Sequence, residues 1–278
     1  MTSIDSKQRR LLEPVLHAFV AILATACSDK SPMSPPQPVE LTIYAASSTR
    51  DALAALDALF EADGATKILV NFGSSGDLAR QVIAAAKADV FLSADEKEMD
   101  RLEQEALLVP GSRRALLSNQ LVVIEPIGVP TALSKGFIPA LLASDAVQHL
   151  SLANVESVPA GRYAKAWLES KDAWAGVAGK VLPAVDVRAA LAAVESGGAE
   201  AGIVYRTDAA HAAKVRIVFT VPTAEGPRIS YPVAAIAGRP NVAASRAYVE
   251  FLASERARAI WEKEGFIVLE PAPPAKQN

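Results

Sequence analysis

The chain has 278 residues, of which 51% are hydrophobic and 21% are charged, so it is long enough to bury a substantial core. Its 28 basic and 31 acidic residues give a formal net charge of −3 without any basic block, and a nucleic-acid partner is not expected, because phosphate binding needs clustered Lys and Arg. The single cysteine excludes a disulfide framework or a cysteine-rich metal site, and beyond the N-terminus no apolar run approaches the roughly 20 residues that cross a bilayer.

Residues 1–26 have the pattern of a secretory signal peptide. Basic residues come first, followed by a mostly apolar stretch that is too short to anchor as a membrane-spanning helix. The stretch ends in Leu23-Ala24-Thr25-Ala26-Cys27, which resembles a bacterial lipobox, in which the cysteine after the cleavage site is lipid-modified. Ala24 stands where leucine is usual, and an ordinary cleaved signal peptide with an incidental cysteine is the alternative. We expect Cys27 to carry a lipid anchor.

Residues 27–40 are interpreted as this anchor cysteine and a linker. The stretch from 28 to 39 contains four prolines and has no apolar periodicity, a composition typical of an extended, semi-rigid spacer. The other end of the chain, residues 271–278, is expected to be a disordered tail.

From Leu41 onward, strand and helix signals alternate, which predicts an α/β fold with largely parallel sheets. Strands are predicted at 41–44, 68–72, 89–92 and 121–124. Apolar residues recur at helical spacing after each of the first two strands, and a charged helix follows the third.

The second half repeats this alternation. Helices are predicted at 137–142 and 163–168, and a third opens at Asp186 and stops at Gly197 and Gly198. Strands are predicted at 201–205, 216–219 and 229–236. One long amphipathic helix is predicted over 242–263.

Two α/β lobes fit this length and pattern. We assign 41–124 to a first lobe, to which 237–270 returns, and 125–236 to a second. The strands at 121–124 and 231–236 are expected to be the two crossings between the lobes. The cleft between such lobes is the default place for a ligand.

Two turns rich in small hydroxyl residues lie where a predicted strand ends and a helix begins. They are Ser47-Ser48-Thr49 and Gly73-Ser74-Ser75-Gly76. Free backbone N–H groups and the helix dipole favour an anion at such a point, and serine adds a hydroxyl donor. Plain N-capping of the helices is the alternative interpretation of both turns.

Enzyme motifs are mostly absent. The chain has no G-x-S-x-G elbow, no Walker A spacing and no G-x-G-x-x-G after a strand. The three histidines, His17, His149 and His211, are widely scattered, so neither a histidine metal site nor a catalytic triad is expected. A hydrolase that uses Ser48 or Ser75 remains an alternative, but it would need a general base for which no motif partner is visible.

In its order of motifs the chain resembles the molybdate-binding protein of bacterial ABC importers, over residues 41–266. The first carriers of the resemblance are Leu41-Thr42-Ile43-Tyr44-Ala45-Ala46-Ser47-Ser48 and Phe72-Gly73-Ser74-Ser75-Gly76-Asp77-Leu78. Further matching segments lie at 88–94, 158–164, 185–191, 202–205 and 231–233. The resemblance implies a two-lobed, periplasmic-binding-protein-like α/β fold of type II, with the ligand cleft between the lobes.

By position, the resemblance implies five ligand-binding residues. Hydroxyl donors fall on Ser48 and Ser75, backbone amides on Ala160 and Val187, and a tyrosine hydroxyl that closes the cleft on Tyr205. All are neutral donors, as the burial of a dianion without a salt bridge requires. A protonated oxyanion such as hydrogen phosphate would also need an acceptor.

The resemblance also implies the ligand and the partners. The ligand is expected to be molybdate or tungstate, with no cofactor, no metal cation site and no enzymatic activity. The partners are expected to be the transmembrane subunits of an ABC permease and their cytoplasmic ATPase, served by a monomer outside the cytoplasm and tethered through Cys27. Ser47 stands where alanine is usual and competes with Ser48 for the ligand role. A carrier of another tetrahedral oxyanion and a two-lobed sensor domain are also compatible with the sequence.

Overall fold

The computed structural model describes residues 39–64, 66–85, 87–128, 133 and 136–270. The predicted signal peptide, Cys27 and the predicted tail lie outside these residues. Nowhere in the described part is a helix both long and apolar enough to cross a membrane.

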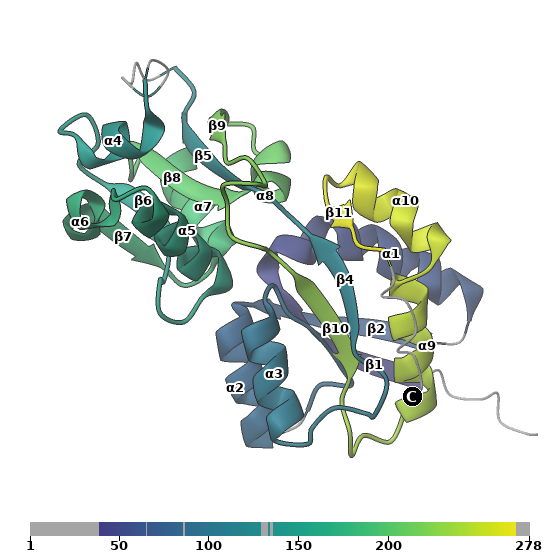
Figure 1. Cartoon of the computed structure of the whole chain (residues 1–278). Helices are drawn as coiled ribbons and strands as arrows, with labels where there is room; N and C mark the ends of the chain where they lie inside the picture. Colours follow the sequence, from purple (N-terminus) through teal and green to yellow (C-terminus); the bar gives the residue numbers. More distant parts are fainter. Residues whose placement is uncertain (1–38, 65, 86, 129–132, 134–135, 271–278) are drawn as a thin grey trace, which may run out of the picture. The chain divides into compact units, whose positions relative to one another are not determined.

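Strands and helices alternate along most of the described chain (Figure 1). The strands are β1 (Val39–Ala46), β2 (Thr66–Gly73), β3 (Val90–Leu92), β4 (Arg114–Ser118), β5 (Leu121–Pro126), β6 (Leu150–Ala153), β7 (Val181–Ala184), β8 (Ala201–Tyr205), β9 (Val215–Thr220), β10 (Tyr231–Ala235) and β11 (Ile267–Val268). The helices are α1 (Arg50–Asp63), α2 (Ser75–Ala85), α3 (Glu96–Gln104), α4 (Ile138–Ala143), α5 (Pro159–Ser170), α6 (Trp174–Val177), α7 (Val187–Glu195), α8 (Arg206–Ala210), α9 (Val242–Leu252) and α10 (Glu255–Lys263). Short 3-10 turns are formed by Ser47–Thr49 and Ala178–Lys180.

The strands form two sheets. The first has the order β11-β4-β10-β3-β1-β2, and the second has the order β7-β6-β8-β5-β9. In the first sheet β1 is parallel to β2 and β3, and β10 is antiparallel to β3; in the second, β6 is parallel to β7 and β8, and β5 is antiparallel to β8. Three neighbouring parallel strands with an antiparallel strand beside them, in both lobes, confirm the predicted two-lobed α/β fold of type II.

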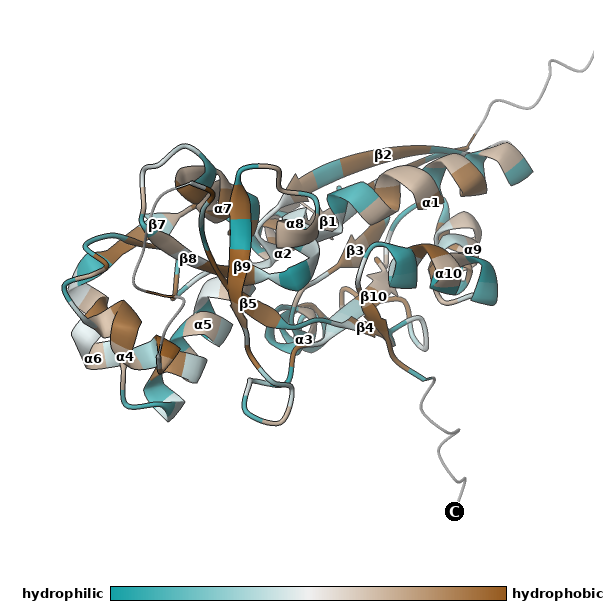
Figure 2. Ribbon diagram, turned by 90° about the horizontal axis from the view of Figure 1, so that it is seen from above, coloured by the Kyte–Doolittle hydropathy of each residue, from teal (hydrophilic) through white to brown (hydrophobic). Residues whose placement is uncertain are grey.

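Each sheet has its own helices and a fully buried centre. α1, α2, α3, α9 and α10 accompany the first sheet, and α4 to α8 the second (Figure 1). β5, β8 and β10 are buried along their whole length, and Figure 2 shows β5 largely in the brown of apolar residues. α1 buries the face that carries Ala52, Leu53 and Leu56, as its periodicity predicts. Burial of each such leucine contributes about 1.5–3 kcal/mol.

The two strands that are predicted to cross between the lobes do not cross. β5 lies in the second sheet and β10 in the first, so the crossings fall at 119–120 and at 221–230 rather than within 121–124 and 231–236. The physical reason is β4, which pairs with β10 in the first sheet. Only Leu116 and Leu117 of β4 are buried, and so short an apolar signal does not identify it as a strand.

The predicted long helix over 242–263 is wrong, because the structure divides it into α9 and α10. Ser254 interrupts the helix: its side-chain oxygen accepts a hydrogen bond from the backbone N–H of Ala257 at 3.3 Å and so caps a new helix. Beyond α10, β11 pairs with β4, which returns the C-terminal segment to the first sheet.

Candidate functional site

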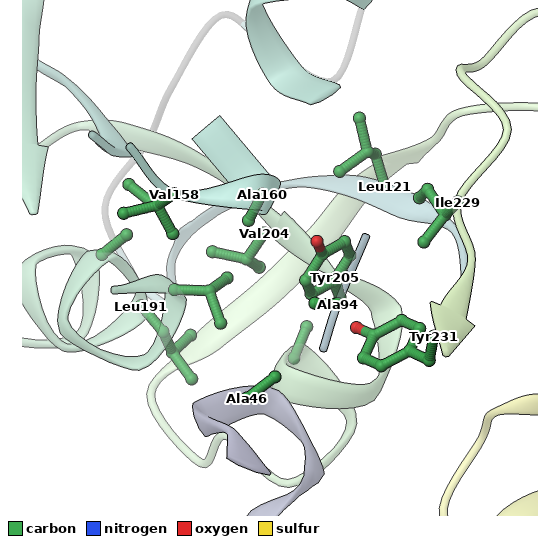
Figure 3. Close-up of a cluster of buried hydrophobic side chains, with 14 of the residues drawn as sticks. Ala46, Ala94, Leu121, Val158, Ala160, Leu191, Val204, Tyr205, Ile229 and Tyr231 are labelled. Carbon is green, nitrogen blue, oxygen red and sulfur yellow. The ribbon is translucent and has the colours of Figure 1, made fainter. Parts of the chain in front are cut away.

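A small cavity lies where residues of the two sheets face each other. Its volume is about 10 Å³, far below the ~300–1,000 Å³ of pockets that hold drug-sized organic ligands. It is lined by Ala46, Ser47, Ser48, Gly73, Ser74, Ser75, Ala94, Val158, Pro159, Ala160, Val187 and Tyr205. The structure therefore brings all five predicted ligand residues to one cavity. Figure 3 shows Ala46, Ala94, Ala160 and Tyr205 around this point.

Three helices begin at residues that line the cavity. α2 starts at Ser75, α5 at Pro159 and α7 at Val187. The first N–H groups of a helix have no partner within it, and the helix dipole makes this end positive. Because Pro159 has no N–H, Ala160 supplies the first donor of α5. The walls of the cavity therefore present backbone donors from several helix starts.

N-capping, the alternative interpretation of the serine turns, holds for Ser74 only. The oxygen of Ser74 accepts from the backbone N–H of Asp77 at 3.2 Å, and its hydroxyl donates to the Asp77 carboxylate at 2.6 Å. Ser47 and Ser48 lie inside a 3-10 turn instead, and neither residue preceding this turn and α1 makes a side-chain cap. The hydroxyls of Ser47 and Ser48 thus have no capping role.

The two candidate serine ligands are held by other parts of the chain. The oxygen of Ser75 accepts from the backbone N–H of Ala94 at 2.9 Å, which leaves the Ser75 proton free to point elsewhere. The oxygen of Ser48 lies 3.0 Å from the hydroxyl oxygen of Tyr231. Both serines are buried. Ser47 is also buried at the cavity, so the structure keeps both neighbours beside it.

The hydroxyl of Tyr205 is an unpartnered buried donor. Tyr205 ends β8 and is 1% exposed, and its hydroxyl has no hydrogen-bond partner among the described residues. Buried polar atoms are nearly always paired, so such a group at a cavity wall points to a ligand atom as its partner. Burial raises the pKa of Tyr205 well above its usual value, which keeps the phenol neutral and able to donate.

The cavity wall itself carries no charge. None of its lining residues has an ionisable carboxylate, amine or guanidinium, and its side-chain hydroxyls come from serines and one tyrosine. An anion in this cavity would be held by neutral donors and dipoles.

Two arginines stand just outside the wall and join the lobes. Arg162 of α5 contacts the carboxylates of Asp95 and Glu98, the latter at 3.1 Å. Arg188 of α7 contacts the carboxylate of Asp51 in α1, and its Nε lies 2.6 Å from that of Asp208. The Arg188–Asp208 contact is an ion pair without the alignment of a hydrogen bond. Each guanidinium group is paired with two carboxylates, so its positive charge is balanced by these side chains rather than by an ion in the cavity.

The geometry does not favour a serine hydrolase. No histidine, aspartate or glutamate lines the cavity. His149 and His211 lie elsewhere, against Glu200 and Glu264. Within the described part of the chain, no general base contacts Ser48 or Ser75.

Two residues beside the site are not identifiable from the sequence. Tyr231 contacts Ser48 although 183 residues separate them, and Asn119 contacts Tyr231. The segment at 231–233 is one of those on which the resemblance in the sequence rests, but nothing in its pattern links it to the first serine turn. Only the three-dimensional structure shows that Tyr231 and Asn119 lie beside Ser48.

The chain is similar to known proteins over most of its length. A family model described as bacterial extracellular solute-binding protein matches residues 41–267. Over 236 residues the chain is 36% identical to the molybdate-binding protein ModA of Escherichia coli (strain K12), which covers 82% of this chain and 89% of that protein. It is 32% identical over 263 residues to the putative ABC transporter substrate-binding lipoprotein YvgL of Bacillus subtilis (strain 168). That match covers 94% of this chain and 98% of the relative. A solved structure, the substrate binding domain of a putative molybdenum ABC transporter from Clostridium difficile, is 35% identical with a TM-score of 0.64 and covers 84% of this chain and 100% of that one.

Proposed function

The chain belongs to the bacterial extracellular solute-binding protein family, and on this basis we propose that it binds molybdate outside the cytoplasm and delivers it to an ABC importer. The single observation that carries the ligand assignment is the unpartnered Tyr205 hydroxyl in the wall of a small, uncharged cavity. Similarity to a molybdate-binding protein at 36% identity supports the same ligand.

The chemistry of the cavity suits an oxyanion that carries no proton. Molybdate is a dianion at neutral pH, and its burial needs several donors to replace lost water. Ser48, Ser75 and Tyr205 supply hydroxyl donors in this proposal, and the N–H groups of Ala160 and Val187 supply backbone donors at helix starts. Tungstate has nearly the same size and charge as molybdate and is proposed to bind in the same way. Sulfate is smaller, so its hydrogen bonds to the same donors would be longer and weaker.

The proposed partners follow from the family. A solute-binding protein of an ABC importer delivers its ligand to transmembrane permease subunits driven by a cytoplasmic ATPase. The family description as extracellular supports an extracytoplasmic location. We also propose that the monomer is the binding unit, since a single chain supplies both lobes and all five proposed ligand residues.

Tethering through Cys27 is a separate part of the proposal. It is supported by the lipobox-like sequence before Cys27 and by the lipoprotein name of the Bacillus subtilis relative. Cys27→Ala should move the protein from the membrane fraction to the soluble fraction of the cell envelope without changing its affinity for molybdate. A wild-type protein found only in the soluble fraction would contradict the tether and leave the ligand proposal intact.

Thermal unfolding with added anions tests the ligand. A ligand that binds only the folded state stabilises it by RT ln(1 + [L]/Kd), about 2.7 kcal/mol at 100 times Kd. Millimolar molybdate should therefore raise the unfolding temperature by several degrees, and equal phosphate should raise it much less. If phosphate stabilised the protein as strongly as molybdate, a carrier of another tetrahedral oxyanion would be the better assignment.

A further inference from the structure

A chain of hydrogen bonds runs from the connection between the lobes to Ser48. It begins at Asn119, in the connection between β4 and β5, where the side-chain Oδ1 accepts from the backbone N–H of Gln120 at 2.9 Å. A backbone N–H can only donate, so the oxygen of this amide must face Gln120. The Asn119 side-chain nitrogen then faces the other way.

This orientation determines the role of Tyr231. The Asn119 nitrogen lies 2.9 Å from the hydroxyl of Thr207 and 3.3 Å from the hydroxyl of Tyr231, and it can only donate to both. Tyr231 is 0% exposed, and its hydroxyl contacts Asn119 and Ser48 within the part of the chain that the structure describes. Since it accepts from Asn119, its own proton is directed to the oxygen of Ser48, 3.0 Å away.

The consequence falls on Ser48. Because the Ser48 oxygen accepts a hydrogen bond from Tyr231, the Ser48 proton is free to be donated to a ligand in the cavity. Ser75 has the same polarity, because its oxygen accepts from the backbone N–H of Ala94. Figure 3 shows the ring of Tyr231 beside that of Tyr205. The centroids of the two rings are 5.8 Å apart.

We propose that Asn119 and Tyr231 are positioning residues that fix Ser48 as a hydrogen-bond donor and thereby make the cavity reject oxyanions that carry a proton. The proposal rests on the proposed function, since it concerns selectivity at the same site. A hydrogen phosphate ion needs an acceptor for its own proton, and Ser48 cannot offer one while Tyr231 donates to it. Sulfate and molybdate need donors only.

The test compares sulfate with hydrogen phosphate at pH 8. The two ions are similar in size and both carry two negative charges, and they differ by the one proton at issue. Dissociation constants are measured for both ions, and for molybdate, with the wild type, Tyr231→Phe and Asn119→Leu. Tyr231→Phe removes the donor to Ser48, and in Asn119→Leu the Tyr231 hydroxyl no longer accepts from Asn119 and can accept from Ser48 instead. In both variants Ser48 can therefore turn its lone pair to the ligand. The preference for sulfate over hydrogen phosphate should therefore fall at least tenfold in both variants, the scale of one hydrogen bond to a charged group.

Thr207→Val is the matched control, because it removes the other acceptor of Asn119 and leaves the bond to Tyr231 in place. Its sulfate-to-phosphate preference should stay within twofold of the wild type. A merely structural role of Tyr231 would weaken all three anions alike, and an unchanged ratio in the two test variants would overturn the proposal. Should one test variant fail to fold, the ratio in the other decides. Failure of the wild type to bind molybdate would refute the proposed function, a result separate from any change in the ratio.

Discussion

A β-carbon placed on Gly76 would stand 2.2 Å from the carbonyl oxygen of Ser157. Gly76 lies in the first turn of α2 in the first lobe, and Ser157 precedes α5 in the second. No real β-carbon tolerates so short a distance to a backbone atom, so the two lobes approach this closely only because position 76 is glycine.

Gly76→Ala is therefore predicted to weaken molybdate binding at least tenfold by holding the lobes apart. Alanine favours a helix by about 1 kcal/mol over glycine, so the ligand-free protein should not lose stability. Titration and thermal unfolding measure the two quantities separately. Gly179→Ala is the control, because a β-carbon there meets nothing within 4 Å. Unchanged affinity in the Gly76 variant would show that binding does not need this approach.

Arg162→Ala is predicted to speed molybdate release at least tenfold, or about 1.4 kcal/mol. Asp95 and Glu98 are buried in the first lobe and would lose their partner from the second lobe. This loss destabilises the arrangement in which the two lobes are in contact around the ligand. Stopped-flow release kinetics provide the measurement. Arg101→Ala removes the same charge and the other partner of Glu98, but one that lies within α3, and it should leave release nearly unchanged. Equal acceleration in both variants would mean that the contact between lobes is unimportant.

Ser48→Ala and Ser75→Ala are each predicted to cost about 1.5–3 kcal/mol of molybdate binding, roughly 10- to 150-fold in affinity. Each removes a donor to a buried dianion. Tyr205→Phe keeps the ring and deletes the unpartnered hydroxyl, so it should weaken binding without opening a cavity. Ser47→Ala is the internal control. A loss with Ser47→Ala as large as with Ser48→Ala would shift the ligand role by one residue, and no change beyond twofold in any of the four would place the ligand elsewhere.

Asp57 is predicted to make the protein less stable as pH rises from about 4 to about 6. Burial, the largest cause, raises the pKa of Asp57 to about 6 in the folded protein, against the lowering effect of its hydrogen bond from Tyr248. The folded state then binds more protons at Asp57 than the unfolded state in this window, so the contribution of Asp57 to the free energy of unfolding falls as pH rises through it and is constant above.

Asp57→Asn is neutral at every pH and still accepts from Tyr248. It should match the wild type below pH 4 and exceed it at pH 8 by about 1–3 kcal/mol, at 1.36 kcal/mol per pKa unit. Urea unfolding at both pH values measures this difference. A difference between Asp57→Asn and the wild type that is the same at both pH values would contradict a raised pKa of Asp57.

Much of the fold is predictable because its signals are local. The buried strand predicted at 121–124 and the helix opened by Asp186 depend on nearby residues, and the structure contains both, the strand as part of β5. β4 and β7 escape prediction because few of their residues are buried, so their patterns are weak. The break at Ser254 escapes it because an amphipathic pattern continues across a cap.

The candidate site likewise has features that local sequence predicts and features that depend on distant residues. Serines after strands and donors at helix starts are visible in the sequence, and the structure gathers them at one cavity. Their roles as ligands remain predictions. The polarity of Ser48 is not predictable, because it depends on Tyr231 and on the orientation of the Asn119 amide, both distant in sequence.

Calorimetric titration of the chain without residues 1–26 decides whether the cavity is a molybdate site. In the proposed site the five ligand groups donate to the oxyanion and none accepts a ligand proton. Molybdate and tungstate should therefore bind in the micromolar range or tighter, ~8 kcal/mol or more, and sulfate and phosphate far more weakly. Phosphate that binds as tightly as molybdate would contradict the assignment.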